Sequence, residues 1–128
     1  MVTQVTAGIQ ITVRTKYQES YSKPSDNHFL FTYIITIENK SEFTVQLMRR
    51  HWFIFDSNGE QREVEGEGVV GQQPVLMPGD VYEYESACNL MTDMGAMHGT
   101  YLFERKADRA RFVVQIPEFR LEAPMKMN

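Results

Sequence analysis

One stretch decides the fold class of this chain: Ile9-Gln10-Ile11-Thr12-Val13-Arg14-Thr15-Lys16-Tyr17. Its odd positions place Ile9, Ile11 and Val13 on one face, and the residues between them are polar. Side chains of a β-strand point alternately to opposite faces of a sheet. A period of two therefore predicts an antiparallel strand with one buried face.

The same period recurs along the rest of the chain. Residues 29–37 alternate with Phe31, Tyr33 and Ile35 inward, and a further strand is expected over residues 43–55. Its alternation slips near Arg49 and Arg50, which predicts a β-bulge. Further strands are expected over residues 61–70, 81–88, 100–106 and 111–116, with an extension through Phe119 and Leu121.

Turn residues separate these strands. Asn39-Lys40-Ser41-Glu42 is interpreted as a hairpin turn, and Asp56-Ser57-Asn58-Gly59 is the strongest turn because Asn-Gly supplies positive φ. Residues 89–99 are interpreted as a loop. About seven strands with no helical periodicity predict an all-β fold. The predicted architecture is a two-sheet antiparallel sandwich of the fibronectin type III or immunoglobulin kind.

Length and composition indicate one domain over residues 1–128, with residues 124–128 frayed. The net charge of −4 argues against nucleic acid and membrane partners, which favour a basic face. Neither an apolar run of about 20 residues nor a secretory signal is present. The single cysteine, Cys88, fits a reducing, cytoplasmic location and is expected in the core.

A literal GxGxxG string occurs at Gly66-Glu67-Gly68-Val69-Val70-Gly71. In dinucleotide-binding proteins this string lets a strand turn into a helix whose N-terminus holds pyrophosphate. Here Pro74 and Pro78 prevent a following helix, Glu65 and Glu67 add negative charge, and the loop itself contains no lysine or arginine. A glycine-shaped β-loop is therefore favoured. The alternative is an anion site formed by Gly66, Gly68 and Gly71.

Metal and catalytic constellations are weak. Cys88, Asp93 and His98 are near one another in the sequence, but no Cys-x-x-Cys or His-x-x-x-His spacing accompanies them. The methionines could ligate copper, yet methionine is also an ordinary core residue: Met91, Met94 and Met97. An acidic stripe would be a poor cage for a divalent cation: Glu63, Glu65 and Glu67. The sequence predicts no metal site, no cofactor and no catalytic residues, so we expect that the protein is not an enzyme.

The most unusual local cluster is Arg50-His51-Trp52. A tryptophan on a middle strand is expected in the core of a sandwich. Arg50 and His51 are therefore the candidates for contact with a partner.

Several blocks together resemble the ApaG family, and the likeness extends over residues 8–122. The most specific blocks are Arg50-His51-Trp52, the run from Gly66 to Leu76, and Pro78-Gly79. Further matching positions are Cys88, Gly95, Met97, Gly99, Tyr101, Pro117, Phe119 and Leu121. The chain departs from the pattern at Thr92-Asp93, where members carry Thr-Pro. Met91, Met94 and His98 do not belong to the pattern, which weakens the copper interpretation.

The resemblance implies a fibronectin-like or immunoglobulin-like sandwich. It also implies a role in protein interaction, because similar domains are fused to an F-box protein and to a polymerase-delta-interacting protein. Bacterial members are linked to cobalt resistance and magnesium efflux, and often neighbour a diadenosine-tetraphosphate hydrolase gene. We therefore expect a non-catalytic module that binds an unidentified protein partner, with a homodimer left open. The alternatives are a pyrophosphate- or nucleotide-binding accessory protein and a cobalt or magnesium homeostasis factor.

Overall fold

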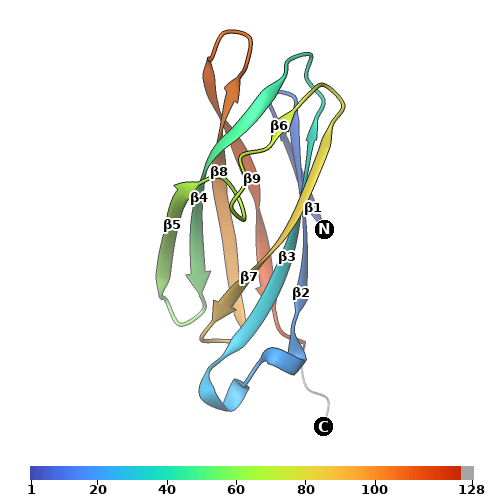
Figure 1. The fold of residues 1–128 in the computed structure, drawn as a ribbon. Helices are drawn as coiled ribbons and strands as arrows, with labels where there is room; N and C mark the ends of the chain where they lie inside the picture. Colours follow the sequence, from blue (N-terminus) through green and yellow to red (C-terminus); the bar gives the residue numbers. More distant parts are fainter. Residues whose placement is uncertain (125–128) are drawn as a thin grey trace.

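Two antiparallel sheets pack face to face in the structure, a computed structural model that describes residues 1–124 (Figure 1). The first sheet has the order β1 (Val2–Thr6), β2 (Ile9–Tyr17), β3 (Phe29–Asn39), β7 (Val81–Leu90). The second has the order β5 (Gln61–Glu67), β4 (Val45–Asp56), β8 (Met94–Arg105), β9 (Arg111–Glu122), and β6 (Val75–Leu76) also pairs with β4. Two 3-10 turns, η1 (Glu19–Tyr21) and η2 (Pro24–Asp26), join β2 to β3. The two-sheet antiparallel sandwich predicted from the sequence is confirmed.

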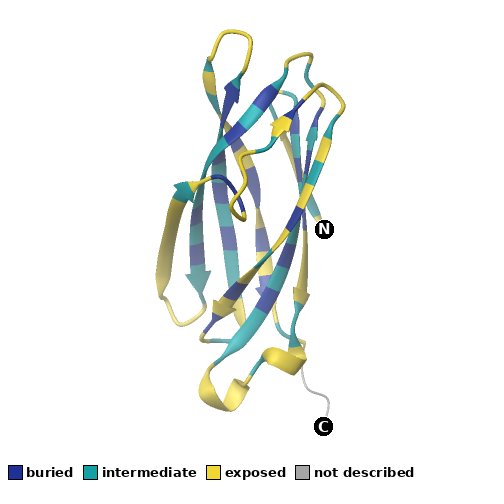
Figure 2. Ribbon diagram, viewed as in Figure 1, coloured by how far each residue is buried: buried dark blue, intermediate teal, exposed yellow. Residues whose placement is uncertain are grey.

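The core lies between the sheets, where the inward residues of the predicted alternation meet (Figure 2). Ile9 and Ile11 of β2 are fully buried, and Trp52 of β4 is only 3% exposed. The Trp52 ring meets Tyr33 of the opposite sheet edge to face, with 5.4 Å between ring centroids. The predicted core positions of Trp52 and Cys88 are confirmed, since Cys88 is also buried.

The two long sides of the sandwich differ. On one side β1 and β2 pack against β9, so the sheets are joined along that seam. On the other side the edge strands are β7 and β5. The segment that follows β5 lies between the sheets there, and β5 itself is almost entirely exposed (Figures 1 and 2). We call this second side the open side.

The slip in alternation on β4 is a β-bulge, as predicted. The pairing of β4 with β8 shifts between Leu47 and Arg49, so Met48 is the extra residue. The turn at residues 56–59 is also confirmed, with Gly59 at φ 93° between β4 and β5. The last hairpin joins β8 to β9, and a second register shift beside Pro117 lets β9 continue to Glu122.

The prediction of a hairpin turn at residues 39–42 is wrong, because β3 and β4 lie in different sheets. This segment is a crossing held by Asn39, which is completely buried. The Asn39 amide donates to the carbonyl oxygens of Phe43 and Leu76 at 2.7 and 3.0 Å. Its Oδ1 accepts from the backbone and hydroxyl of Ser41. The Asn39 side chain thus bonds four polar groups. Residue types alone do not distinguish such a buried asparagine from one in a hairpin turn.

The prediction of a loop over residues 89–99 is also wrong, since β7 runs to Leu90 and β8 begins at Met94. Gly95 and Gly99 are part of β8 because the neighbouring strand comes very close. A Cβ at Gly99 would lie 2.1 Å from the carbonyl oxygen of His51. These glycines permit close strand approach and do not mark a turn.

The described residues form nine strands and not the predicted seven, because β1 and β6 were not predicted. β1 pairs with β2 through a tight turn in which Ala7 and Gly8 have positive φ, and β6 is only two residues long. The predicted frayed segment reaches beyond Pro124, and residues 125–128 lie outside the described residues. Within residues 1–124, no helix is long and apolar enough to span a membrane.

Candidate functional site

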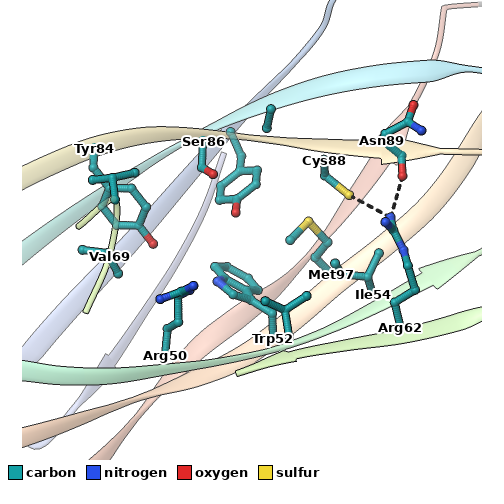
Figure 3. Close-up of a pocket in the computed structure, with 14 residues that line it drawn as sticks. Arg50, Trp52, Ile54, Arg62, Val69, Tyr84, Ser86, Cys88, Asn89 and Met97 are labelled. Carbon is teal, nitrogen blue, oxygen red and sulfur yellow. Dashed lines mark hydrogen bonds between the residues drawn. The ribbon is translucent and has the colours of Figure 1, made fainter. Parts of the chain in front are cut away.

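A pocket of about 340 Å³ opens on the open side of the sandwich (Figure 3). Its walls come from β3 and β7 of one sheet, from β4, β5 and β8 of the other, and from the loop after β5. The polar and aromatic residues that line it are Tyr33, Arg50, Trp52, Arg62, Tyr84, Ser86, Cys88 and Asn89. The site therefore combines segments from most of the chain.

Arg50 lies on the inward face of β4, opposite Gly66 of β5. Its Nη1 donates to the carbonyl oxygens of Glu67 and Gly68 at 2.9 and 3.0 Å. These two bonds fix the guanidinium group, and Figure 3 shows Arg50 at the pocket wall. The absence of a side chain at Gly66 leaves the space that the arginine occupies.

Arg62 enters from β5 and reaches across the open side to β7. Its Nη2 donates to the carbonyl oxygen of Asn89 and lies 3.6 Å from the Sγ of Cys88 (Figure 3). Neither Arg50 nor Arg62 forms an ion pair with a carboxylate among residues 1–124. Both positive charges therefore remain without a charged partner from the described part of the chain.

The other titratable groups of the pocket are neutral near pH 7. Burial raises the pKa of Tyr33 and of the Cys88 thiol, and it raises the pKa of Tyr84 strongly. Tyr84 shares a hydrogen bond with the hydroxyl of Tyr101, whose pKa burial also raises. Desolvation disfavours the charged forms of these groups. The pocket is therefore positively charged, although the chain as a whole carries −4.

The acidic residues of β5 lie on the opposite, outer face of the same strand. Glu67 points toward Arg49 at 4.0 Å, and Glu63 is hydrogen-bonded to the Nε2 of His51. The ligand atoms of His51, Glu63 and Glu65 lie within 4.8 Å of one another. Such a set could offer three ligands to a divalent cation, but on an exposed sheet face with no enclosing wall. The contribution of His51 could not be predicted from the sequence, because strand register creates the cluster.

The glycine loop is held by its own backbone bonds. The Gly68 amide donates to the carbonyl oxygen of Met48 in the bulge at 2.9 Å, and Val69 and Gln72 exchange two bonds of 2.8 Å. Gly68 has φ 63°, and a Cβ there would lie 2.3 Å from the carbonyl oxygen of Gln72. Gly71 has φ 78° in the turn. That the loop also binds an anion through Gly66, Gly68 and Gly71 stays a prediction.

The predicted partner residues Arg50 and His51 lie on opposite faces of the sheet, as their alternation requires. Only Arg50 is part of the pocket. Cys88, Asp93 and His98, which are near one another in the sequence, do not form a cluster among the described residues, and His98 stacks on Phe53 at 5.1 Å. Neither Arg62 nor Tyr84 stands out in the sequence, and only the pairing of strands shows that they line the same pocket as Arg50.

Comparisons with known proteins agree with this architecture. A family model described as the ApaG domain matches residues 19–105. The Protein ApaG of Paramagnetospirillum magneticum is 49% identical over 97% of this chain and 95% of its own length, and that of Brucella canis is 48% identical over the same shares. A crystal structure from Bordetella pertussis, of a protein with the name ApaA, has a TM-score of 0.88 and 39% identity, covering 92% of this chain and 95% of that one. This chain therefore belongs to the ApaG family.

Proposed function

We propose that this ApaG domain is a non-catalytic, cytoplasmic binding module of the fibronectin-like or immunoglobulin-like kind. It binds another protein over the open side of the sandwich. The observation that carries the proposal is the strained backbone and the exposed side chain of Val70. This valine has φ 43° at the tip of the glycine loop, and it is 55% exposed at the mouth of the pocket.

A β-branched residue at positive φ is a backbone outlier that costs of order 1–3 kcal/mol. An exposed valine does not recover that cost through burial in the core. Contact with a partner would recover it, and Val64 on the neighbouring wall is also 40% exposed. Exposed apolar side chains around a polar pocket are typical of protein interfaces.

The chemistry of the pocket supports binding over catalysis. Burial raises the pKa of the Cys88 thiol, and its hydrogen-bond partner is the donor Arg62, which cannot act as a base. The nucleotide alternative is less well supported, because the amides of Gly68, Val69 and Gln72 already bond within the protein. The cobalt or magnesium alternative rests only on the exposed cluster of His51, Glu63 and Glu65.

The test uses the strained valine itself. A photoreactive amino acid is placed at position 70 and, as a control, at Lys16, which is exposed on the first sheet. We expect one protein from the native lysate to cross-link from position 70 and not from position 16. If the protein cross-linked from position 70 is a second copy of this chain, the open side is the interface of a homodimer.

The purified partner is then titrated with wild type and with Val70→Gly. Glycine adopts positive φ without strain, so this variant should keep or raise the melting temperature. We expect its affinity for the partner to fall by about tenfold, as for loss of one apolar anchor. Equal cross-linking from both positions, or equal affinity of the variant, would reject the proposal. Calorimetry with ATP, Co²⁺ and Mg²⁺ tests the two alternatives.

A further inference from the structure

The lining of the open-side pocket has an unbalanced charge. Fourteen residues line it, and they include two arginines but no Asp, Glu, Lys or His from the described chain. The acidic side chains of β5 project to the other face, where Glu63 meets His51 and Glu67 meets Arg49. A pocket with two positive charges inside a protein of net charge −4 is complementary to an anion.

Each arginine keeps part of its hydrogen-bonding capacity free. The described hydrogen bonds of Arg50 use Nη1, and those of Arg62 use Nη2, so the other guanidinium nitrogens have no partner within residues 1–124. Backbone carbonyl oxygens fix both groups in place. A fixed guanidinium fork matches the geometry of a carboxylate and loses little entropy when it binds one.

The neighbouring polar groups of the pocket add no opposing charge. Tyr84 and Ser86 lie along the first-sheet wall (Figure 3), and Tyr33 lines the same pocket. Burial raises the pKa of both tyrosines, so they remain protonated near pH 7 and do not repel an anion. The opposite wall is apolar, with Trp52, Ile54 and Met97 beside the arginines.

We infer that the open-side pocket binds an acidic side chain of the protein partner, with its carboxylate on the free guanidinium nitrogens of Arg62 and an adjacent apolar side chain on the wall of Trp52 and Ile54. This inference rests on the proposed function and names the group that anchors the partner. The volume of about 340 Å³ fits this occupant. It lies at the lower end of the range of about 300–1,000 Å³ for ligand pockets.

The test is a titration followed by ¹H–¹⁵N NMR, with the indole N–H of Trp52 as the reporter, since it is the single tryptophan of the chain. The probes are the blocked peptide Ac-Leu-Glu-Leu-NH₂, its isosteric control Ac-Leu-Gln-Leu-NH₂, sodium butyrate and inorganic phosphate. We expect the Glu peptide to shift the Trp52 signal and to bind at least about tenfold more tightly than the Gln peptide, as for a charge-assisted bond.

Arg62→Gln should remove this preference, whereas Arg14→Gln should not, because Arg14 is exposed and paired with Glu83 outside the pocket. Arg62→Lys separates charge from geometry and should restore only part of the affinity. Equal binding of the two peptides would overturn the inference. Tighter binding of phosphate or of butyrate than of the Glu peptide would also overturn it, in favour of a phosphate or a free organic acid.

The outcome is separable from that of the proposed function. A partner that cross-links at position 70, together with equal affinity for both peptides, leaves the proposed function intact and rejects the carboxylate anchor. Selective binding of the Glu peptide without any cross-linked partner keeps the carboxylate site and rejects the surface around Val70 as the protein-binding surface.

Discussion

Arg50 lies directly across from Gly66 on the neighbouring strand, and its guanidinium group occupies the space into which a side chain at position 66 would project. A Cβ at Gly66 would lie 3.1 Å from both Nη atoms of Arg50. The position of Arg50 therefore depends on the glycine. Because Gly66 has no side chain, the Arg50 guanidinium group can donate to the carbonyl oxygens of Glu67 and Gly68.

The three loop glycines should differ in their tolerance of alanine. Gly68→Ala should destabilise the fold most, by more than about 1 kcal/mol, because positive φ is combined with a backbone overlap. Gly71→Ala should cost less, since its φ of 78° is unfavourable but no atom lies within 4 Å. Gly66→Ala should cost least, because its φ is not positive and a shift of a few tenths of an ångström at the end of the Arg50 side chain would relieve the contact.

Urea unfolding of the three variants, followed by circular dichroism, measures this order. Gly59→Ala is the matched control, because Gly59 has positive φ in a different turn and its Cβ would meet nothing within 4 Å. A Gly68→Ala protein as stable as Gly71→Ala would show that the overlap with Gln72 relaxes without cost.

The buried hydroxyl groups of Tyr84 and Tyr101 should behave as a coupled pair. They are hydrogen-bonded to each other inside the core. Tyr84→Phe or Tyr101→Phe leaves one buried hydroxyl without its partner, so each should cost about 1–3 kcal/mol. The double variant removes both groups and should cost less than the sum of the two.

A double-mutant cycle in urea provides the coupling energy. Tyr21→Phe is the control, because Tyr21 is exposed, and it should be neutral. Additive losses in the cycle would mean that the two hydroxyls do not depend on each other.

The Cys88 thiol should react slowly with a disulfide reagent in the folded protein. Burial raises its pKa, so the thiolate fraction at pH 7.5 is lower than for a free cysteine, and the thiolate is the reactive form. We expect the rate to rise as the pH rises toward the shifted pKa, and to reach the free-cysteine value in urea.

The rate is measured by absorbance with 5,5′-dithiobis(2-nitrobenzoate), with glutathione as the standard. Arg62→Gln should slow the reaction further near pH 7.5, since the positive charge of Arg62 lowers the thiol pKa. A native rate equal to that of glutathione would place Cys88 at the surface.

Local signals in the sequence predicted much of the fold. The alternation of Ile9, Ile11 and Val13 is a property of one strand, so it can be read without knowledge of its neighbours. The same holds for Trp52 and for the bulge near Arg49. Asn39 could not be placed correctly, because its role depends on carbonyl groups of Phe43 and Leu76 that only the folded chain brings to it.

The pocket was much less predictable than the strands. Counting charges along the chain placed Glu65 and Glu67 at the glycine loop and found no basic residue there. In the folded chain the charge at the loop is the opposite of this count. Alternation directs the acidic side chains outward, and cross-strand pairing brings Arg50 to the loop. Which charges meet is a property of strand register, and register is not encoded in any short segment.

The seam between β1, β2 and β9 has a practical consequence for the whole polypeptide. The first and the last strand of the domain both belong to this seam, on the side opposite β5 (Figure 1). A tag, a neighbouring domain or a solid support attached ahead of β1 or behind β9 would be tethered away from the pocket. The domain is thus suited to work as a fused unit, with its chain ends serving as handles while its receptive side stays unobstructed.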